Sequence, residues 1–294
     1  MTAVMTSAQD VGLEVFRRGK VRDTFVLDDG SLLMVATDRV SAFDVVMPDP
    51  IPDKGRVLTQ MSRWWFHRTA DIVPNHLLPD RDDAVPAAVW SEWRERSMRC
   101  ARAERIDIEC VVRAHLSGSG WKEYREHGTL AEEPLPPGLR DSSPLPELRF
   151  TPATKNDDGH DVNISRAELA RTVGTELGAE LEDASLRLFR FAAEHCRSRG
   201  IILADTKFEF GLIGGRLHLI DEIFTPDSSR LWEASEWREG QAAVSFDKQP
   251  IRDHLEALGW DKRPPGPKLP PEVVSATTAR YREAARRICD IELS

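Results

Sequence analysis

The sequence of 294 residues lacks the features of a secreted, membrane-bound or nucleic-acid-coating protein. Its four cysteines are widely spaced and form no CxxC pair, which predicts reduced thiols in a cytoplasmic protein. No apolar run approaches the roughly 20 residues of a transmembrane helix, and no basic-then-apolar leader opens the chain, so we expect neither a membrane span nor a signal peptide. Basic residues are in the minority: 40 Lys and Arg against 49 Asp and Glu give a formal net charge of −9, which argues against binding to a phosphate backbone.

What the sequence does contain is enough apolar material for a folded protein. Hydrophobic residues make up 40%, which excludes wholesale disorder, and the length suits two lobes or one large domain. Strand and helix patterns alternate along the chain, so we expect an α+β or α/β fold in two lobes. Two proline-rich stretches, residues 134–152 and 264–271, are expected to be ordered surface connections, because proline removes a hydrogen-bond donor and fixes φ.

Hydrophobic periodicity and turn residues predict the main elements. The expected strands are residues 21–27 and 32–37 as one hairpin, 106–116 as a buried strand, and 201–210 and 216–223 as a second hairpin around Gly214-Gly215. The expected helices are residues 57–70, one that starts at the capping box of Ser165 and Glu168, one that carries Leu181 and Leu188 and ends near Gly200, and one from about residue 271.

A basic turn precedes the first hairpin. Gly19 stands beside Lys20 and Arg22, and a glycine among cations lets backbone amides approach an anion while the side chains neutralise it. This is not a P-loop, because Val21 stands where Ser or Thr is needed. The alternative interpretation is a solvated basic turn on an edge strand.

Two further segments carry polar side chains with open interpretations. Residues 37–44 follow the second strand and contain Asp38 and Ser41, which predict either a site at the strand end or a helix cap with a surface ion pair. Residues 155–161 form an acidic loop that either binds a hard cation or is a solvated turn.

Two arginines are followed or preceded by hydroxyl groups. Arg113 ends the buried strand before a Ser/Gly loop that contains Ser119, and a guanidinium fork with hydroxyls and glycine amides suits phosphate or carboxylate. Ser119 with His115 suggests a hydrolase, but the G-x-S-x-G elbow is absent, and an ordinary turn is the alternative. Arg230 follows two serines and is interpreted as a phosphate ligand or as a partner stacked on Trp232.

The strand at residues 201–210 is the most informative segment. Alternation places Asp205, Lys207 and Glu209 on one face, and this carboxylate–ammonium–carboxylate row suits Mg²⁺ and phosphate held together. A salt-bridge ladder on an exposed face is the alternative. A two-residue turn would place Glu222 opposite Lys207, whereas a bulge would bring Asp221 there instead, and the pattern leaves this register open.

Taken together, the segments provide several cation and hydroxyl sets for anions and one carboxylate set for a metal. An activated Ser, an activated Cys and a zinc-ligand cluster are all missing from the pattern. This combination favours phosphoryl chemistry, in which positioning and charge neutralisation supply most of the catalysis.

The order of these motifs resembles that of the SAICAR synthetase family. The resemblance rests on GKVRDTF, ATDRVSAFD, IPDKG, ECVVRAHLSGSGWKEY, TPATKND, LADTKFEFG and DEIFTPDSSRLW, from about Gly19 to Trp232, with SFDKQPIRDHL continuing the longer form of the family. It implies an ATP-dependent ligase of de novo purine biosynthesis, which joins L-aspartate to the carboxylate of CAIR through an acyl phosphate and releases SAICAR, ADP and phosphate. A small-molecule kinase and a non-catalytic nucleotide sensor are the alternatives.

The resemblance also implies roles for individual residues. Those expected at ATP are Gly19, Lys20 and Arg22 over the phosphates and Ala103, Arg105 and Ile106 at adenine. Those expected at CAIR are Arg113, Ser119 and Arg230, with Lys207 and the supporting carboxylate Asp205 nearby as catalytic residues. Those expected on the substrate and aspartate side are Asp38, Ser41, Lys155, Asn156 and Asp157. Glu209 and Asp221 are expected to hold Mg²⁺, and the preference for Asp221 over Glu222 implies that the hairpin register is not the simple one.

The family fold implied by the resemblance has two lobes. Residues 1–112 would form a β-rich, kinase-like lobe for ATP, and residues 113–294 a larger α/β lobe for substrate and metal, closed by the terminal helix. The expected partners are small molecules only, and the expected assembly is a monomer or a small homo-oligomer.

Overall fold

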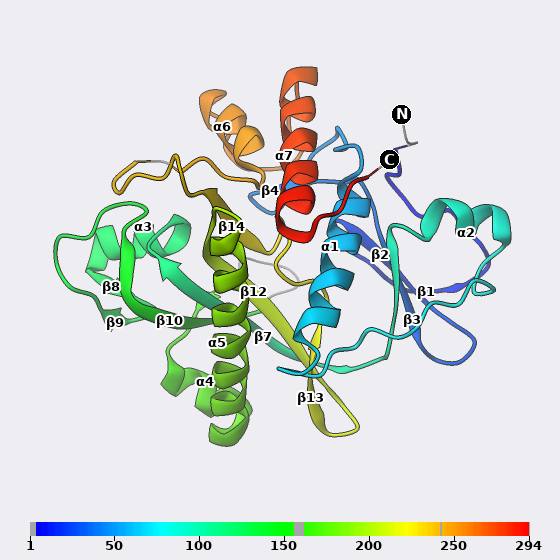
Figure 1. Cartoon of the computed structure of the whole chain (residues 1–294), viewed down its shortest axis with the longest axis horizontal. Coiled ribbons are helices and arrows are strands. Elements are labelled where there is room, and N and C mark those ends of the chain that lie inside the picture. The colour runs from blue at the N-terminus through cyan, green and yellow to red at the C-terminus, as the bar shows by residue number, and fades with distance from the viewer. Residues whose placement is uncertain (1–3, 156–161, 242, 294) are drawn as a thin grey trace.

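The computed structural model describes residues 4–155, 162–241 and 243–293, in which two larger antiparallel sheets are accompanied by two small two-stranded ones (Figure 1). The first sheet has the order β1-β2-β3-β6. Its strands are β1 (Glu14–Arg18), β2 (Arg22–Val26), β3 (Leu32–Ala36) and β6 (Ser97–Cys100). The predicted first hairpin is confirmed, because β2 pairs with β3 around a turn in which Gly30 has a φ of +77°.

The second sheet has β12 at its centre and includes the second predicted hairpin. Its strands are β7 (Glu104–His115), β10 (Pro144–Thr154), β11 (Val162–Asn163), β12 (Ile201–Ile213), β13 (Arg216–Ile220) and β14 (Ser229–Glu233). The order is β11-β10-β7-β12-β13, and β14 pairs with the first half of β12. The chain passes from the first sheet to the second between Cys100 and Glu104, so the expected lobe boundary at residue 112 falls inside β7.

One proline-rich stretch behaves differently from the prediction. Residues 144–152, expected to be a surface connection, belong to β10 and pair with β7. The prediction was wrong because β11 pairs with only the last two residues of β10, which leaves the rest of that strand at the sheet edge, where proline is tolerated.

The remaining elements are two small hairpins and the helices. The hairpins pair β4 (Ser41–Ala42) with β5 (Val45–Val46), and β8 (Thr129–Leu130) with β9 (Glu133–Pro134). The helices are α1 (Lys54–Thr69), α2 (Ala87–Trp93), α3 (Gly118–His127), α4 (Arg166–Val173), α5 (Thr175–Ser198), α6 (Gln249–Ala257) and α7 (Pro271–Cys289). The capping box is confirmed, since the Ser165 hydroxyl accepts a hydrogen bond from the Glu168 amide.

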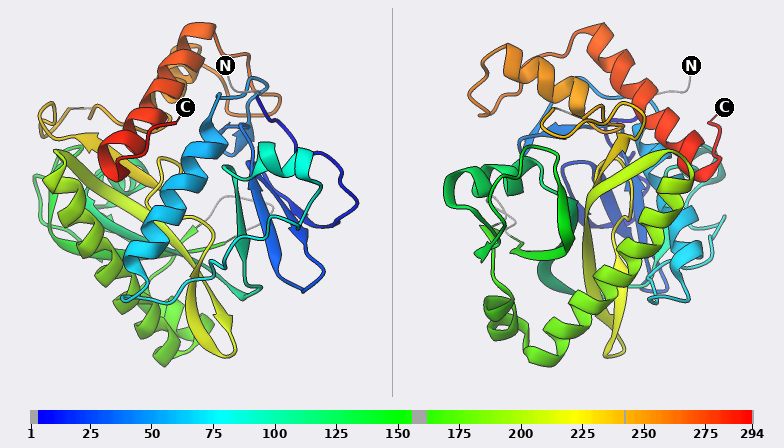
Figure 2. Two further views of the ribbon diagram at one scale, coloured as in Figure 1. Left: turned by 45° about the vertical axis from the view of Figure 1, so that its right-hand side comes forward. Right: turned by 60° about the vertical axis from the view of Figure 1, so that its left-hand side comes forward.

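The largest hydrophobic cluster of the described residues contains the second sheet together with Met98 and Cys100 of β6 in the first sheet. The long helix α5 lays its apolar face, including Leu188 and Phe189, against Phe208 and Phe210 on one face of β12. Helix α1 lies between this layer and the first sheet (Figure 2). Its Trp65 is fully buried. The other apolar side chains of the first sheet, such as Phe25 and Leu33, pack in a separate cluster with Trp93 of α2.

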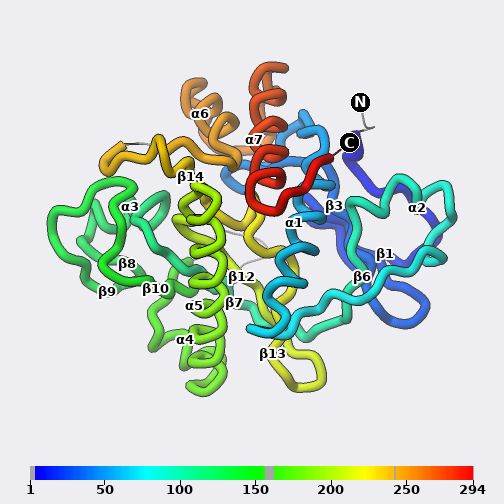
Figure 3. Tube along the Cα trace, in the orientation of Figure 1, coloured from blue at the N-terminus to red at the C-terminus, as the bar shows by residue number. Residues whose placement is uncertain are grey.

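The C-terminal residues close one end of the molecule. Helix α7 lies beside α1, and α6 with the chain up to Val274 packs over the β4–β5 hairpin (Figure 3). Within the part of the chain that the structure describes, no helix is long and apolar enough to cross a membrane.

Candidate active site

A cavity of about 880 Å³ lies between the two sheets and gathers residues from distant parts of the sequence. Its lining comes from the β1–β2 loop, the β4–β5 hairpin, the crossing to β7, the face of β12, the segment after β13, and the start of α6. The predicted site residues that line it are Gly19, Lys20, Arg22, Ser41, Ala103, Arg105, Lys155, Lys207, Glu209 and Asp221. Ten predicted residues therefore face a common space.

The predicted alternation on β12 is confirmed. Lys207 and Glu209 face the cavity, while Phe208 and Phe210 are fully buried on the opposite face. The Lys207 ammonium lies 2.7 Å from Glu109 Oε1, and Glu209 forms an ion pair with Lys155. Burial works against the charge of Lys207, but Glu109 outweighs it and raises the pKa of that ammonium, so Lys207 keeps its proton at neutral pH.

Asp221 reaches the cavity by a route that neither register alternative described. The β12–β13 ladder is the simple one, with Glu209 opposite Ile220 and no shift, so the expected irregular register is wrong. The strand ends at Ile220, and Asp221 adopts a left-handed backbone with φ of +67°. This turn breaks the alternation of side chains, and Arg22 Nη2 consequently donates to both Asp221 Oδ2 at 2.7 Å and Glu222 Oε1 at 3.1 Å.

The positive charge near Asp221 does not offset the cost of burying its carboxylate. Burial, with Glu209 and Glu222 nearby, raises the pKa of Asp221 to about 6 despite the opposing effect of Arg22. Among the described residues, no three His, Cys, Asp or Glu side chains come together as a complete metal site. Two carboxylates are nevertheless what Mg²⁺ requires where phosphate oxygens and water supply its other ligands, so Glu209 and Asp221 fit that ion.

The basic turn is fixed by its neighbours. The Gly19 amide donates to the Arg22 carbonyl at 2.7 Å, and Arg39 donates to the carbonyl oxygens of Gly19 at 2.9 Å and Lys20 at 3.1 Å. The Lys20 ammonium lies 2.8 Å from Asp44 of the β4–β5 turn, and both side chains are about half exposed. Lys20 therefore lines the cavity and is held there by an exposed contact that is weak enough to exchange.

Two of the three residues expected at adenine line the cavity. Ala103 and Arg105 line it together with the apolar side chains of Leu32 and Met34 from β3. Ile106 is not one of the lining residues and is buried in the core instead, since it follows Arg105 on a strand and points to the other face.

Other predicted substrate residues lie elsewhere. Asp38 is fully buried, does not line the cavity, and accepts hydrogen bonds from the amides of Met5 at 2.8 Å and Gly55 at 3.0 Å and from Arg96 at 3.1 Å. Asn156 and Asp157 lie outside the described residues.

A separate cluster, which we call the arginine cluster, joins Arg113, Arg230, Asp205, Ser117 and Ser119. The Asp205 carboxylate accepts from Arg230 at 2.7 Å, Ser117 at 3.1 Å and Arg113 at 3.3 Å, and Arg113 also donates to Ser119 at 3.3 Å. These side chains are not lining residues of the large cavity. Two guanidinium groups share one carboxylate here, so the cluster keeps one positive charge for an anion.

The glycine of the Ser/Gly loop explains how the arginines come so close. A Cβ on Gly118, whose φ is +57°, would lie 2.1 Å from Arg230 Nη2. The hydrolase interpretation finds no support, because Ser119 contacts Arg113, and burial lowers the pKa of His115 to about 4.

Several cavity residues were not predicted. Glu109, His76, Asp227, Lys248 and Arg252 all line it. Lys248 and Arg252 lie in the segment SFDKQPIRDHL, which the resemblance included without giving its residues a role. Asp227 stands two residues before the serine that precedes Arg230, so its position in the TPDSSR motif was the available signal.

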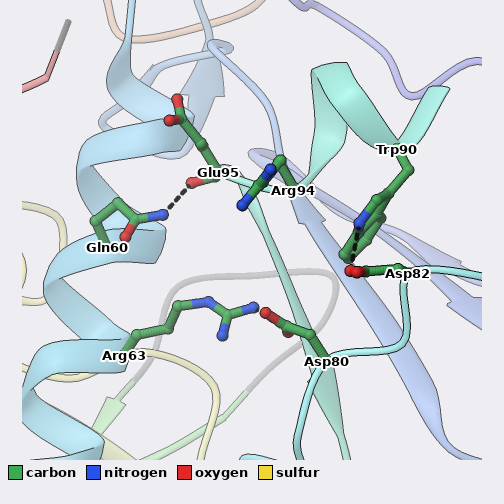
Figure 4. A pocket seen from close by; sticks show the side chains of 7 residues that line it. All are labelled: Gln60, Arg63, Asp80, Asp82, Trp90, Arg94 and Glu95. Carbon is green, nitrogen blue, oxygen red and sulfur yellow. Dashed lines mark hydrogen bonds and ion pairs between the residues drawn. The ribbon is translucent and has the colours of Figure 1, made fainter. Parts of the chain in front are cut away.

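A second, smaller cavity of about 270 Å³ lies away from these residues, between α1 and α2 (Figure 4). Three of its polar groups are satisfied locally: Arg63 pairs with Asp80, the Trp90 indole donates to Asp82, and Gln60 donates to the Glu95 carbonyl. None of the predicted site residues lines this cavity, so it does not compete with the large one as the candidate site.

Comparisons with known proteins agree with the order of the motifs. Residues 15–267 match the family model described as SAICAR synthetase. A phosphoribosylaminoimidazole-succinocarboxamide synthase of Thermodesulfovibrio yellowstonii is 48% identical over 94% of this chain and 95% of its own, and one of Desulfosudis oleivorans is 51% identical over 93% and 94%. The structure of SAICAR-synthase from Saccharomyces cerevisiae, complexed with SAICAR, superimposes with a TM-score of 0.90 at 38% identity and covers 99% of both chains.

Proposed function

Because the chain belongs to the SAICAR synthetase family, we propose that its large cavity is where L-aspartate is joined to the carboxylate of CAIR. The protein is an ATP-dependent ligase of purine biosynthesis that forms SAICAR, ADP and phosphate. The observation that carries the assignment of the cavity is the contact of Arg22 with Asp221, 199 residues later in the chain. It brings the expected nucleotide loop and the expected metal carboxylates to one place.

The chemistry follows from the low reactivity of a carboxylate toward amines. A carboxylate repels a nucleophile and has no good leaving group, and phosphorylation by ATP removes both obstacles. In the proposed sequence, a CAIR carboxylate oxygen attacks the γ-phosphorus and ADP leaves. The aspartate amine then attacks the acyl phosphate carbon, and phosphate leaves as the amine loses its proton.

Cationic side chains of the cavity would hold the transferring phosphoryl group. Lys207 stays protonated and lines the cavity from β12, and Lys20 lines it from the basic turn. Two positive charges at the phosphoryl group would neutralise charge that develops during transfer. Lys207 cannot act as a base while it carries this proton.

Glu209 and Asp221 would hold Mg²⁺. When bound, the ion supplies charge neutralisation to phosphate oxygens. Lys155 and Arg22, which contact these two carboxylates in the structure, would then be free to donate to phosphate.

We assign the arginine cluster to the phosphate of CAIR. Arg113 and Arg230 share Asp205, so their remaining donors can take a phosphate without burying an unpaired charge. Asp205 then acts as a positioning residue for the two arginines rather than as a group that touches the reacting atoms.

The test is an ADP-release assay in which CAIR, L-aspartate and ATP are omitted in turn. We expect full release only with all three substrates, and carboxylate ¹⁸O of CAIR should appear in the released phosphate. A phosphorylated product that accumulates without aspartate would identify a small-molecule kinase instead. Chelation of magnesium should abolish release, and its restoration should recover it.

The proposed setting is the cytoplasm, with small-molecule substrates and no nucleic acid. The net charge of −9 and four buried free cysteines support this setting. A monomer or small homo-oligomer stays a prediction, which sedimentation of the purified protein would decide.

A further inference from the structure

Three successive carbonyl oxygens of the basic turn are held by the segment that follows β3. Arg39 donates from Nη2 to the Gly19 carbonyl at 2.9 Å and from Nε to the Lys20 carbonyl at 3.1 Å. The Val21 carbonyl accepts from the amide and from the hydroxyl of Thr37, each at 2.9 Å. Carbonyl oxygens would repel an anion, and here all three are directed toward Thr37 and Arg39.

The direction of two amides follows from that of the carbonyls. In a planar trans peptide the N–H and the C=O point to opposite sides, so the amides of Lys20 and Val21 point away from Arg39. Neither amide donates a hydrogen bond to any other described residue, and both residues line the large cavity. Two such amides beside the Lys20 ammonium are a suitable set of donors for a phosphate oxygen.

The guanidinium of Arg39 is itself fixed by a buried carboxylate. Its Nη2 donates to Asp23 Oδ1 at 2.9 Å, and its Nη1 donates to the Thr6 carbonyl at 2.5 Å and to Asp23 Oδ2 at 3.5 Å. Asp23 is fully buried and also accepts from the Ala8 amide at 2.9 Å. Together with the two contacts to the basic turn, these bonds use all five N–H donors of the guanidinium, and the side chain is only 18% exposed.

We propose that Arg39 is a positioning residue for the phosphates of the nucleotide and acts through the basic turn, an inference that rests on the proposed function. Its guanidinium keeps no donor for a ligand, so Arg39 holds the turn and does not bind the nucleotide itself. The carbonyl oxygens of the turn are thereby directed away from the phosphates before the nucleotide arrives. A preformed site needs less ordering on binding, so Arg39 increases nucleotide affinity without touching the reacting atoms.

Arg18 supplies a matched control, because it pairs with Asp23 but does not reach the turn. Its Nη1 lies 3.1 Å from Asp23 Oδ2, and among the described residues its guanidinium otherwise donates only to Ser7. Arg18→Met therefore removes one partner of Asp23 and leaves the carbonyls of the basic turn engaged. Arg39→Lys keeps a positive charge for Asp23, but one ammonium cannot reproduce a planar fork with five donors.

The experiment measures nucleotide affinity apart from catalysis. Calorimetry gives Kd for ADP with magnesium, steady-state ADP release gives KM for ATP, CAIR and L-aspartate, and thermal unfolding gives Tm. For Arg39→Lys we expect Kd for ADP and KM for ATP to rise roughly 10- to 100-fold, the range for losing a hydrogen bond to a charged group. KM for CAIR and L-aspartate in this variant, and Kd for ADP in Arg18→Met, should stay within about twofold of wild type.

An unchanged Kd for ADP in Arg39→Lys, or an equal rise in Arg18→Met, would overturn the inference. Equal increases in KM for all three substrates would indicate a general loss of structure and would overturn it as well. If Arg39→Lys does not fold, the double variant Asp23→Asn with Arg39→Met decides by the same rise in Kd, because it removes both charges of the pair and leaves no buried carboxylate there. Wild type that binds ADP but releases none in response to CAIR and L-aspartate would reject the proposed function alone.

Discussion

Replacing Asp205 with Asn should destabilise the protein through the arginine cluster. Asp205 is buried and its Oδ2 contacts both Arg113, whose side chain is 5% exposed, and Arg230, whose side chain is 29% exposed. Asn keeps the size of the side chain but removes its charge, so two guanidinium groups would face each other without a counterion. The substitution removes the carboxylate of Asp205, while the charges of Arg113 and Arg230 remain.

The size of the effect follows from the burial of these groups. Breaking a buried ion pair by removing one partner costs about 3–5 kcal/mol, and the partial exposure of Arg230 favours the lower end. For a chain of this length, about 3 kcal/mol corresponds to a decrease in Tm of roughly 6–12 °C. Inorganic phosphate should recover part of this loss, because an anion that binds the folded state stabilises it.

Thermal unfolding of wild type and Asp205→Asn, in chloride and in phosphate at equal ionic strength, measures both effects. Phosphate should raise the Tm of the variant by several degrees more than that of wild type. A variant with an unchanged Tm in chloride would refute the view that Asp205 neutralises the arginines. Equal phosphate effects on both proteins would refute the assignment of the cluster to phosphate.

Three further predictions concern single residues. Glu209→Gln should lower ADP-release turnover by roughly 100-fold or more and should also lower the Tm, because Lys155 loses its ion-pair partner. Normal turnover with added magnesium would remove Glu209 from the metal site. Gly118→Ala should raise KM for CAIR, because the added Cβ displaces Arg230. The control is Gly128→Ala, which should leave this KM unchanged, since Gly128 has a similar φ of +71° but open space around it. Equal effects of the two variants would point to backbone strain alone. Burial, reinforced by Arg22, lowers the pKa of His76 to about 3, so between pH 3 and the usual pKa of 6.5 the unfolded state binds one proton more than the folded state. The free energy of unfolding should therefore fall by up to about 1.4 kcal/mol for each pH unit by which the pH decreases. Urea titrations at pH 6 and pH 5 should show a smaller decrease for His76→Gln than for wild type.

The parts of the fold that the sequence predicted are those governed by local pattern. The two main hairpins, the capping box at Ser165 and the alternation of Lys207 and Glu209 with Phe208 all follow from neighbours in the chain. Such features depend on the side-chain periods of strands and helices and on turn residues, so they can be predicted without knowledge of long-range contacts.

The features that were missed depend on contacts across the chain or on a single backbone angle. Asp38 resembles a site residue by its position after a strand, but it is buried because its carboxylate satisfies amides at Met5 and Gly55. Asp221 turns toward the cavity through a left-handed φ that no alternation pattern includes. Lys248 lies beside Asp227 only because α6 returns over the β4–β5 hairpin.

The ion pairs of the cavity explain how charged groups remain buried before substrates arrive. Glu209 pairs with Lys155, and Arg22 pairs with Asp221, so neither acids nor cations stand alone in a low-dielectric space. A nucleotide with its magnesium brings both signs of charge together. We infer that binding would exchange partners, with phosphate pairing with the cations and the carboxylates left to hold the ion. We infer that a neutral substitution of Lys155 alone would leave Glu209 without its ion-pair partner in the free protein, and would weaken folding as well as nucleotide binding.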